Sequence, residues 1–239
     1  RRKSILENPL ESFCTSPVLG STLKQLDEAA AKTILAEAGL RVPRFCLLTM
    51  AEACAGQFDK IDIPYPLAVK ICSADIGHKT EGGGIQLNID TESELIAAIT
   101  SITAATKHHA PDAHLDGFLI ESMVASPIAE LMISLRRDTQ FGLILTIASG
   151  GVLTELLQDS VTVLMPASDQ TVNEAIDNLR IARVLDGFRG GQTASRRDCL
   201  NHVQALVKLM QSRVDIIEIE INPVMMGAQQ AVCADALIT

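Results

Sequence analysis

Polar and apolar side chains alternate strictly over residues 217–222, and this pattern constrains the fold more than any other feature of the chain. The polar positions are Glu218, Glu220 and Asn222, and isoleucines occupy the positions between them. Successive side chains of a β-strand point to opposite faces, so the three polar residues share one face. The pattern predicts a strand with one apolar face to bury.

Other segments carry either helical spacing or the pattern of an extended strand. Apolar stripes and cap residues predict helices over 26–39, 49–58, 91–108, 168–185 and 195–213. Apolar or alternating runs predict strands over 43–48, 66–72, 83–89, 118–124, 130–138, 143–149, 216–226 and 231–238. Residues 138–142, D-T-Q-F-G, predict a tight hairpin. Long helices between blocks of antiparallel strands indicate an α+β fold.

Charge and composition argue against two classes of partner. The 239 residues carry a net charge of −9 and only 3% aromatic side chains, with no Trp. An acidic chain without a basic stripe does not suit a nucleic-acid backbone, and it offers little surface for stacking on bases. No apolar run reaches the ~18 residues that a membrane span needs. We therefore expect neither nucleic acid nor membrane as a partner.

The cysteines and the start of the chain suggest where the protein works. The six cysteines form no C-x-x-C pair, and four of them lie in apolar runs. This usage is typical of reduced, buried thiols in a cytoplasmic protein. The chain begins with Arg1, and residues 1–21 follow no regular pattern. We expect a fragment or a processed chain whose residues 1–21 form a linker or docking arm; as a linker, they would follow an upstream domain.

Lys70 stands alone among apolar residues in the predicted strand 66–72, P-L-A-V-K-I-C. An ammonium group cannot remain unpaired inside a core. One interpretation is that Lys70 reaches solvent from an edge strand. The other is that its ammonium contacts a phosphate group. The strand pattern leaves both open.

The segment 78–84, H-K-T-E-G-G-G, follows Lys70 closely. Its three glycines would let main-chain N–H groups approach a polyanion, while a flexible hairpin tip is the plain alternative. Imidazole is a competent nucleophile near neutral pH, so His78 is a candidate phosphoryl acceptor. A lone histidine is more often an ordinary surface residue.

Asp235 follows Asn222 by 13 residues, in the last predicted strand. If 216–226 and 231–238 pair as a hairpin through the turn near Gly227, the two side chains lie side by side. Carboxylate and amide oxygens without His or Cys suit Mg²⁺. The alternative is a solvated strand face with scattered acids.

Seven stretches occur in the order found in one known family. They are L-D-E-A-A-A-K-T-I-L-A-E-A-G-L-R-V-P (26–43), Y-P-L-A-V-K-I-C-S-A-D-I-G-H-K-T-E-G-G-G (65–84), G-F-L-I-E-S-M-V (117–124), E-L-M-I-S-L-R-R-D-T-Q-F-G (130–142), S-G-G-V-L-T-E-L-L-Q-D (149–159), L-D-G-F-R-G (185–190) and E-I-E-I-N-P-V (218–224). The chain resembles the ATP-grasp domain of NDP-forming acyl-CoA synthetases over about residues 22–239. Within that family it resembles the β subunit, or equivalent domain, of ADP-forming acetate–CoA ligase, which is related to the β subunit of succinyl-CoA synthetase.

The resemblance implies two α+β subdomains, 22–116 and 117–239, that grip ATP or ADP between their sheets. Lys70 would contact the α/β-phosphates, and the loop 77–84 would close over the terminal phosphate. The binding residues implied in and next to this loop are Lys79, Gly82, Gly83 and Gly84.

The resemblance also implies roles further along the chain. Glu121 and Val124 would lie at the strand whose main chain recognises the adenine edge, and Glu130 would lie near the ribose or the metal. Mg²⁺ would be held by Asn222 and Asp235. These assignments would place the metal on the second subdomain.

His78 matches the β-subunit histidine that is transiently phosphorylated in ADP-forming acetate enzymes. It would pass phosphate between a phosphohistidine of the α subunit and ADP. CoA and acid chemistry would belong to a CoA-binding α-type domain or subunit. Because the chain has no Trp and one Tyr, adenine would lie between aliphatic side chains such as Val69, Leu119 and Ile221.

The match has two departures. Ala148 begins a turn where the family pattern has Gly, and Val163 replaces an Arg of many relatives, which puts one positive contact in doubt. Two other functions share the fold: a non-catalytic regulatory domain of a fused protein lysine acetyltransferase, and an ATP-dependent carboxylate–amine ligase, which has no obvious need for His78. The sequence leaves open the acid, the choice between ADP and GDP, and whether the partner is fused or separate.

Overall fold

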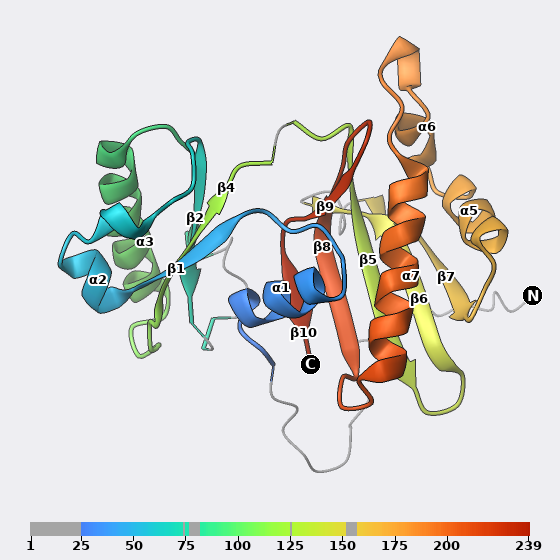
Figure 1. Ribbon diagram of the computed structural model, residues 1–239, viewed down its shortest axis with the longest axis horizontal. Coiled ribbons are helices and arrows are strands. Elements are labelled where there is room, and N and C mark those ends of the chain that lie inside the picture. Colours follow the sequence, from blue (N-terminus) through green and yellow to red (C-terminus); the bar gives the residue numbers. More distant parts are fainter. Residues whose placement is uncertain (1–24, 74, 77–81, 125, 152–156) are drawn as a thin grey trace, which may run out of the picture.

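The computed structural model describes residues 25–73, 75–76, 82–124, 126–151 and 157–239. Its strands form two antiparallel sheets, each with helices packed against it (Figure 1). Each sheet has its own hydrophobic core. The α+β class expected from the sequence is therefore confirmed. None of the helices in these ranges is long and apolar enough to cross a membrane.

The first sheet has four strands in the order β1-β4-β2-β3. They are β1 (Phe45–Thr49), β2 (Leu67–Cys72), β3 (Ile85–Ile89) and β4 (Gly117–Ser122). The apolar stripe of α3 (Glu92–His109) packs against alternate residues of β2 and closes the core of this sheet. The short elements α2 (Met50–Cys54) and η2 (Phe58–Lys60) complete this layer.

The second sheet follows the path β10-β8-β5-β6-β7, and β9 also pairs with β8. Its strands are β5 (Ala129–Asp138), β6 (Gly142–Ser149), β7 (Ser160–Met165), β8 (Glu218–Met226), β9 (Ala231–Cys233) and β10 (Ala236–Ile238). The helical elements of this half are α5 (Asp169–Asp177), α6 (Ala182–Leu185), η4 (Phe188–Gly190) and α7 (Arg196–Ser212). Helices α5 and α7 contribute apolar residues to one core with β5, β6 and β8.

Helix α1 (Glu28–Glu37) lies where the two sheets approach each other (Figure 1). Asp27 caps it by accepting a hydrogen bond from the main-chain N–H of Ala30 at 2.8 Å. Ala31 and Leu35 pack in the core of the second sheet. Ala29 packs against residues of β2 and β4 in the first sheet. Glu28 and Lys32, the buried polar residues of α1, are thereby held between the two sheets.

Several local predictions are confirmed. Thr49 forms a complete capping box with Glu52 at the start of α2. Thr91 and Ser195 cap α3 and α7 through their side chains. Strands β8, β9 and β10 pair antiparallel, as the predicted hairpin requires.

Other expectations differ from the structure. Strand β7 was not expected, and the helix predicted over 168–185 is two helices, α5 and α6. The strand predicted over 231–238 is interrupted at residues 234–235, between β9 and β10. Because β4 pairs with β1 and β2, the chain passes from one sheet to the other between Ser122 and Ala129. The subdomain division after residue 116 remains a prediction.

Candidate functional site

Lys70 lies on a central strand, because β2 is placed between β4 and β3. Only 6% of the residue is exposed. Its neighbours Val69 and Ile71 pack in the core of the first sheet, and the alternation of the strand directs Lys70 to the opposite face. The interpretation of Lys70 as a solvent-reaching residue of an edge strand is therefore wrong.

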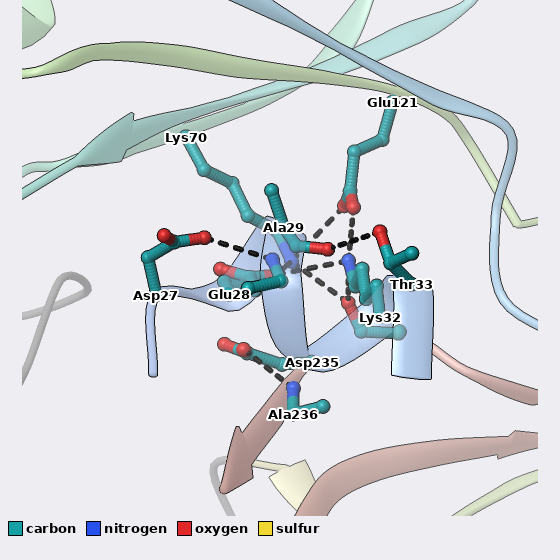
Figure 2. Close-up of polar contacts among 11 residues, drawn as sticks. Asp27, Glu28, Ala29, Lys32, Thr33, Lys70, Glu121, Asp235 and Ala236 are labelled. Atoms are coloured by element: carbon teal, nitrogen blue, oxygen red, sulfur yellow. Dashed lines mark hydrogen bonds and ion pairs between the residues drawn. The ribbon is translucent and has the colours of Figure 1, made fainter. Parts of the chain in front are cut away.

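Lys70 belongs to a buried charge cluster, which consists of Glu28, Lys32, Lys70 and Glu121 (Figure 2). Its Nζ lies 2.6 Å from Oε1 of Glu28 and 3.0 Å from Oε2 of Glu121. It also donates a hydrogen bond to the main-chain oxygen of Ala234 at 2.8 Å. The cluster thus connects α1, β2 and β4 with the turn that precedes β10.

The surroundings of Lys70 favour its charged form. Burial by itself lowers the pKa of Lys70, but the nearby carboxylates of Glu28, Asp235 and Glu121 raise it above its ordinary value. A permanent cation is therefore held between the two sheets, beside Asp235. Such a group is suited to contact a phosphate oxygen.

Asn222 and Asp235 lie opposite each other, as predicted. The main-chain N–H of Asn222 donates to the main-chain oxygen of Asp235 at 3.2 Å. Oδ1 of Asn222 accepts from the N–H of Gly151, and Oδ1 of Asp235 accepts from the N–H of Ala236, both at 2.8 Å. The two side chains offer oxygen donors only, which fits Mg²⁺; such an ion usually keeps several waters in addition to one or two carboxylates.

Glu130 lies against the glycine turn that follows β6. A β-carbon on Gly151 would collide with the Glu130 carboxylate. The main-chain N–H of Gly150 donates to the main-chain oxygen of Glu130 at 2.8 Å. Since the N–H of Gly151 reaches Asn222, this turn brings Glu130 and Asn222 to the same part of the second sheet.

The glycine run enters β3 beside β2. The main-chain oxygen of Gly84 accepts from the N–H of Ile71, the neighbour of Lys70, at 2.8 Å. Gly82 and Gly83 lie against the end of α3, where added β-carbons would meet His109 and Ala105. The run therefore starts at α3 and ends next to the strand that carries Lys70.

Three further residues of the predicted site, Val124, His78 and Lys79, remain to be placed. Val124 is half-buried in the segment that follows β4. His78 and Lys79 lie outside the described residues, so their roles remain predictions.

The expected aliphatic adenine pocket is wrong in its residues. Val69, Leu119 and Ile221 are all fully buried. Val69 and Ile221 pack in the separate cores of the two sheets, and Leu119 packs with Ala29 under α1. Side chains committed to three different clusters cannot enclose one ring.

Glu28 and Lys32 were missed as members of the site. They lie four residues apart on α1 and form an ion pair of 2.9 Å. The available signal was a Glu and a Lys at i, i+4 within a helix whose other buried residues are apolar. Lys32 is fully enclosed, which is rare for a lysine unless it is paired.

Asp159 is a second polar residue that sequence reasoning missed. Its carboxylate accepts from the Ser149 hydroxyl at 2.8 Å and from the main-chain N–H groups of Arg180 and Ile181 at 2.8 and 3.0 Å. It therefore fastens the end of β6, next to the glycine turn, to the start of α6.

Two surface hollows lie elsewhere. One, of about 430 Å³, is lined by residues of α1 and α7, and the other, of about 570 Å³, is lined by residues between 177 and 186. Neither hollow is lined by a residue of the predicted site. The candidate site therefore consists of the charge cluster together with Glu130, Asn222 and Asp235 of the second half of the chain.

The family model of an ATP-grasp domain matches residues 18–239. The β subunit of ADP-forming acetate–CoA ligase I from Pyrococcus furiosus is 30% identical over 214 residues, which span 89% of this chain and 90% of that subunit. ADP-forming acetate–CoA ligase I from Archaeoglobus fulgidus is 30% identical over 162 residues, 68% of this chain but 23% of that longer protein.

A solved structure of similar fold comes from Ca. Korarchaeum cryptofilum. It is dinucleotide forming acetyl-coenzyme A synthetase 1 in complex with coenzyme A, Ca-AMPCP and HgCl+. The TM-score is 0.82 at 28% identity, over 90% of this chain and 93% of that one. A further structure of that protein, with Mg-AMPPCP, has a phosphohistidine segment pointing towards the nucleotide binding site; its TM-score is 0.70 at 27% identity, over 90% of this chain and 92% of that one. The family resemblance, the ATP-grasp fold and the ligase class stated from the sequence are confirmed.

Proposed function

The chain belongs to the ATP-grasp family, as a relative of β subunits of ADP-forming acetate–CoA ligases, and on this basis we propose that it is the nucleotide-binding phosphoryl-transfer module of an ADP-forming acyl-CoA synthetase. The reaction would be acyl-CoA plus ADP plus phosphate to carboxylic acid plus ATP plus CoA. Phosphoryl transfer depends on positioning and charge neutralisation more than on covalent chemistry by the protein. The chain supplies groups suited to both tasks.

One observation carries the proposal. Lys70, on the first sheet, donates to the main-chain oxygen of Ala234, which directly precedes Asp235 on the second sheet. The lysine proposed to bind phosphate and the aspartate proposed to bind metal therefore lie next to each other, although they are 165 residues apart in the chain. A nucleotide with bound cation needs this combination, because its phosphates require neutralisation from more than one side.

The proposed nucleotide contacts follow from these positions. Lys70 would contact the α/β-phosphates, and the main chain at Gly82, Gly83 and Gly84 would approach the terminal phosphate. On the same sheet as Lys70, Glu121 and Val124 would lie at the strand whose main chain recognises the adenine edge. On the second sheet, Glu130 would lie near the ribose or the metal. Lys79 would add a positive charge in the loop that precedes the glycines.

Asn222 and Asp235 would hold Mg²⁺ through one amide oxygen and one carboxylate. When bound, the ion neutralises negative charge on the β- and γ-phosphate oxygens. The hydrogen bond from Gly151 orients the Asn222 amide, so that its oxygen rather than its NH₂ group faces the turn. The protein thus contributes fixed oxygen donors, which suit a hard cation.

His78 would act as the phosphoryl carrier. A phosphohistidine keeps the transfer potential of the phosphoryl group while it moves between two sites. Support comes from the Korarchaeum protein, whose structures include a phosphohistidine segment pointing towards its nucleotide site.

A CoA-binding α-type domain or subunit would complete the enzyme. The two acetate–CoA ligases illustrate a separate partner subunit and a fused partner domain. One relative is a β subunit of which the chain covers 90%, and the other is a longer protein of which the chain covers 23%. CoA and acid would bind to that partner, and the isolated chain would bind nucleotide without making acyl-CoA.

The test measures nucleotide binding and phosphorylation separately. Calorimetry should detect Mg²⁺-dependent binding of ADP by the isolated chain, and Lys70→Met should weaken it at least tenfold. Incubation with the CoA-binding partner, acyl-CoA and phosphate should place acid-labile phosphate on the chain, and His78→Ala should abolish this label. An isolated chain that binds no ADP would overturn the nucleotide role, and full turnover by His78→Ala would overturn the carrier role. Binding without any phosphorylation would instead indicate the regulatory function.

A further inference from the structure

Lys32 and Lys70 contact the same three residues. Nζ of Lys32 pairs with Glu28 at 2.9 Å, contacts Oε1 of Glu121, and donates to the main-chain oxygen of Ala234 at 2.8 Å. Nζ of Lys70 contacts Glu28, Glu121 and the same Ala234 oxygen. Two ammonium groups from distant parts of the chain are therefore held by one shared set of residues (Figure 2).

Each of the two lysines donates two hydrogen bonds within the cluster and forms one further ion pair there. An ammonium group has three N–H donors and no acceptor. Lys32 and Lys70 each have three acceptors within 3.0 Å. Because its ammonium is held by these contacts, we expect Lys70 to loosen at least one of them when it binds a phosphate oxygen.

The two lysines differ in their freedom to do this. The Lys32 side chain is 0% exposed and belongs to the same helix as Glu28, which keeps the two side chains together. The Lys70 side chain is 7% exposed, and the charge of Asp235, a proposed metal ligand, acts on it. Lys70 is the member that can exchange partners.

Charge balance determines what such an exchange costs. With both lysines in place, the cluster holds two positive and two negative side chains. When Lys70 turns to a phosphate, Glu28 and Glu121 keep Lys32, and the cluster carries a net charge of −1. Without Lys32, two neighbouring buried carboxylates would be left with no counter-ion, an arrangement that is strongly unfavourable.

Resting on the nucleotide function proposed above, we propose that Lys32 is a positioning residue: it is the permanent counter-cation of Glu28 and Glu121 that allows Lys70 to leave them and bind phosphate. Lys32 itself does not touch the nucleotide. It affects binding only by neutralising part of the charge of Glu28 and Glu121 when Lys70 has moved away from them.

The proposal orders four proteins by the net charge that the cluster carries once Lys70 has turned to a phosphate. It is 0 in Glu28→Gln, −1 in the wild type, −1 in the double variant Lys32→Met/Glu28→Gln, and −2 in Lys32→Met. The affinity for Mg²⁺–ADP should follow the same order, with about tenfold or more between neighbouring levels. Glu28→Gln should bind more tightly than the wild type, and the double variant should return close to the wild-type value.

Isothermal calorimetry gives the affinities, and thermal unfolding identifies variants that no longer fold. A purely structural role for Lys32 and Glu28 would weaken binding in both single variants and more so in the double variant, which would overturn the proposal. Lys32→Met with wild-type affinity would overturn it as well. If Lys32→Met does not fold, Glu28→Gln and the double variant still decide the order. Failure of the nucleotide function itself would be seen separately, as a wild-type chain that binds no ADP.

Discussion

The main-chain N–H of Gly151 donates a hydrogen bond to Oδ1 of Asn222 at 2.8 Å, which fastens the glycine turn after β6 to the middle of β8. Gly151 has φ +66°, a conformation that other residues rarely adopt, and a β-carbon there would collide with Glu130. The positive φ therefore favours glycine at this position, and a larger residue would also displace the Glu130 carboxylate. The contact fixes the orientation of an amide that we assign to the metal site.

We predict that Asn222→Ala weakens Mg²⁺-dependent ADP binding and also lowers stability. The change removes a proposed metal ligand and the part-buried hydrogen bond from Gly151, whose loss costs about 0.5–1.5 kcal/mol. Calorimetry with Mg²⁺ and with a chelator measures the effect on metal-dependent ADP binding. Thermal unfolding measures the effect on stability. Glu218→Gln, on the same face of β8, is the matched control and should retain ADP affinity. Unchanged Mg²⁺ dependence in Asn222→Ala would exclude the residue from the metal site.

We predict that Asp235→Ala abolishes the Mg²⁺-dependent part of ADP binding, because it removes the only carboxylate of the proposed ligand pair. Its effect should exceed that of Asn222→Ala, since a carboxylate neutralises the cation and an amide does not. The measurement is a titration of ADP at several Mg²⁺ concentrations. A variant that keeps the wild-type response to Mg²⁺ would show that Asp235 is not a ligand.

Gly150→Ala should destabilise the protein by about 2–3 kcal/mol through overpacking. The new β-carbon would meet main-chain atoms of Leu131 on the neighbouring strand, which cannot move aside as a flexible side chain would. Gly191→Ala is the control and should cost much less, because its φ of −66° suits alanine and its nearest contact, at 3.2 Å, is milder than those of Gly150. Chemical unfolding of both variants measures the difference, and equal stability would contradict the tight packing of the turn.

Local patterns predicted much of this fold, for reasons visible in single elements. Strand β8 was predicted because its alternation covers one face with isoleucine, and α3 because Thr91 caps it ahead of a regular apolar stripe. Strand β7 was missed, although S-V-T-V-L-M alternates, because the segment is short and lies at the edge of its sheet. The break between α5 and α6 has a tertiary cause, because the N–H groups of Arg180 and Ile181 donate to the Asp159 carboxylate.

The site was predictable as single residues and not as an arrangement. Lys70 was recognised because a charge in an apolar strand requires a partner. Its partners Glu28 and Glu121 come from α1 and β4, and no local periodicity connects them. Lys32 escaped notice because helical lysines are usually solvated, and only the meeting of the two sheets at α1 encloses it.

Asp159→Asn should lower the free energy of unfolding by about 1–3 kcal/mol at pH 7, because it weakens three hydrogen bonds to a buried carboxylate. Burial raises the pKa of Asp159. Hydrogen bonds from the N–H groups of Arg180 and Ile181 and from the Ser149 hydroxyl lower it by a larger amount, so the pKa is below its ordinary value. A carboxyl group with a lowered pKa stabilises the fold above its unfolded value of about 3.8 and loses that contribution as the pH falls. The difference between wild type and variant should therefore shrink as the pH falls below about 4. Asp62→Asn, at an exposed position, is the control, and a difference at pH 3 as large as that at pH 7 would contradict the assignment.

Two buried thiols should make the protein less stable in alkali. Burial raises the pKa of both Cys199 and Cys233 to about 12, from an ordinary value of 9.0. Between these values the unfolded chain loses protons that the folded chain retains, so the free energy of unfolding falls as the pH rises above 9. Each thiol contributes up to about 1.4 kcal/mol per pH unit.

The measurement is urea unfolding under reducing conditions between pH 8 and about 10.5, below the range in which the raised pKa of Lys70 adds its own loss. The double variant Cys199→Ala/Cys233→Ala should start from a lower stability, because it leaves small cavities, but show a flatter decline with pH. Cys54→Ala, at an exposed position, is the control and should keep the wild-type slope. An unchanged slope in the double variant would mean that these thiols ionise in the folded protein as readily as in the unfolded chain.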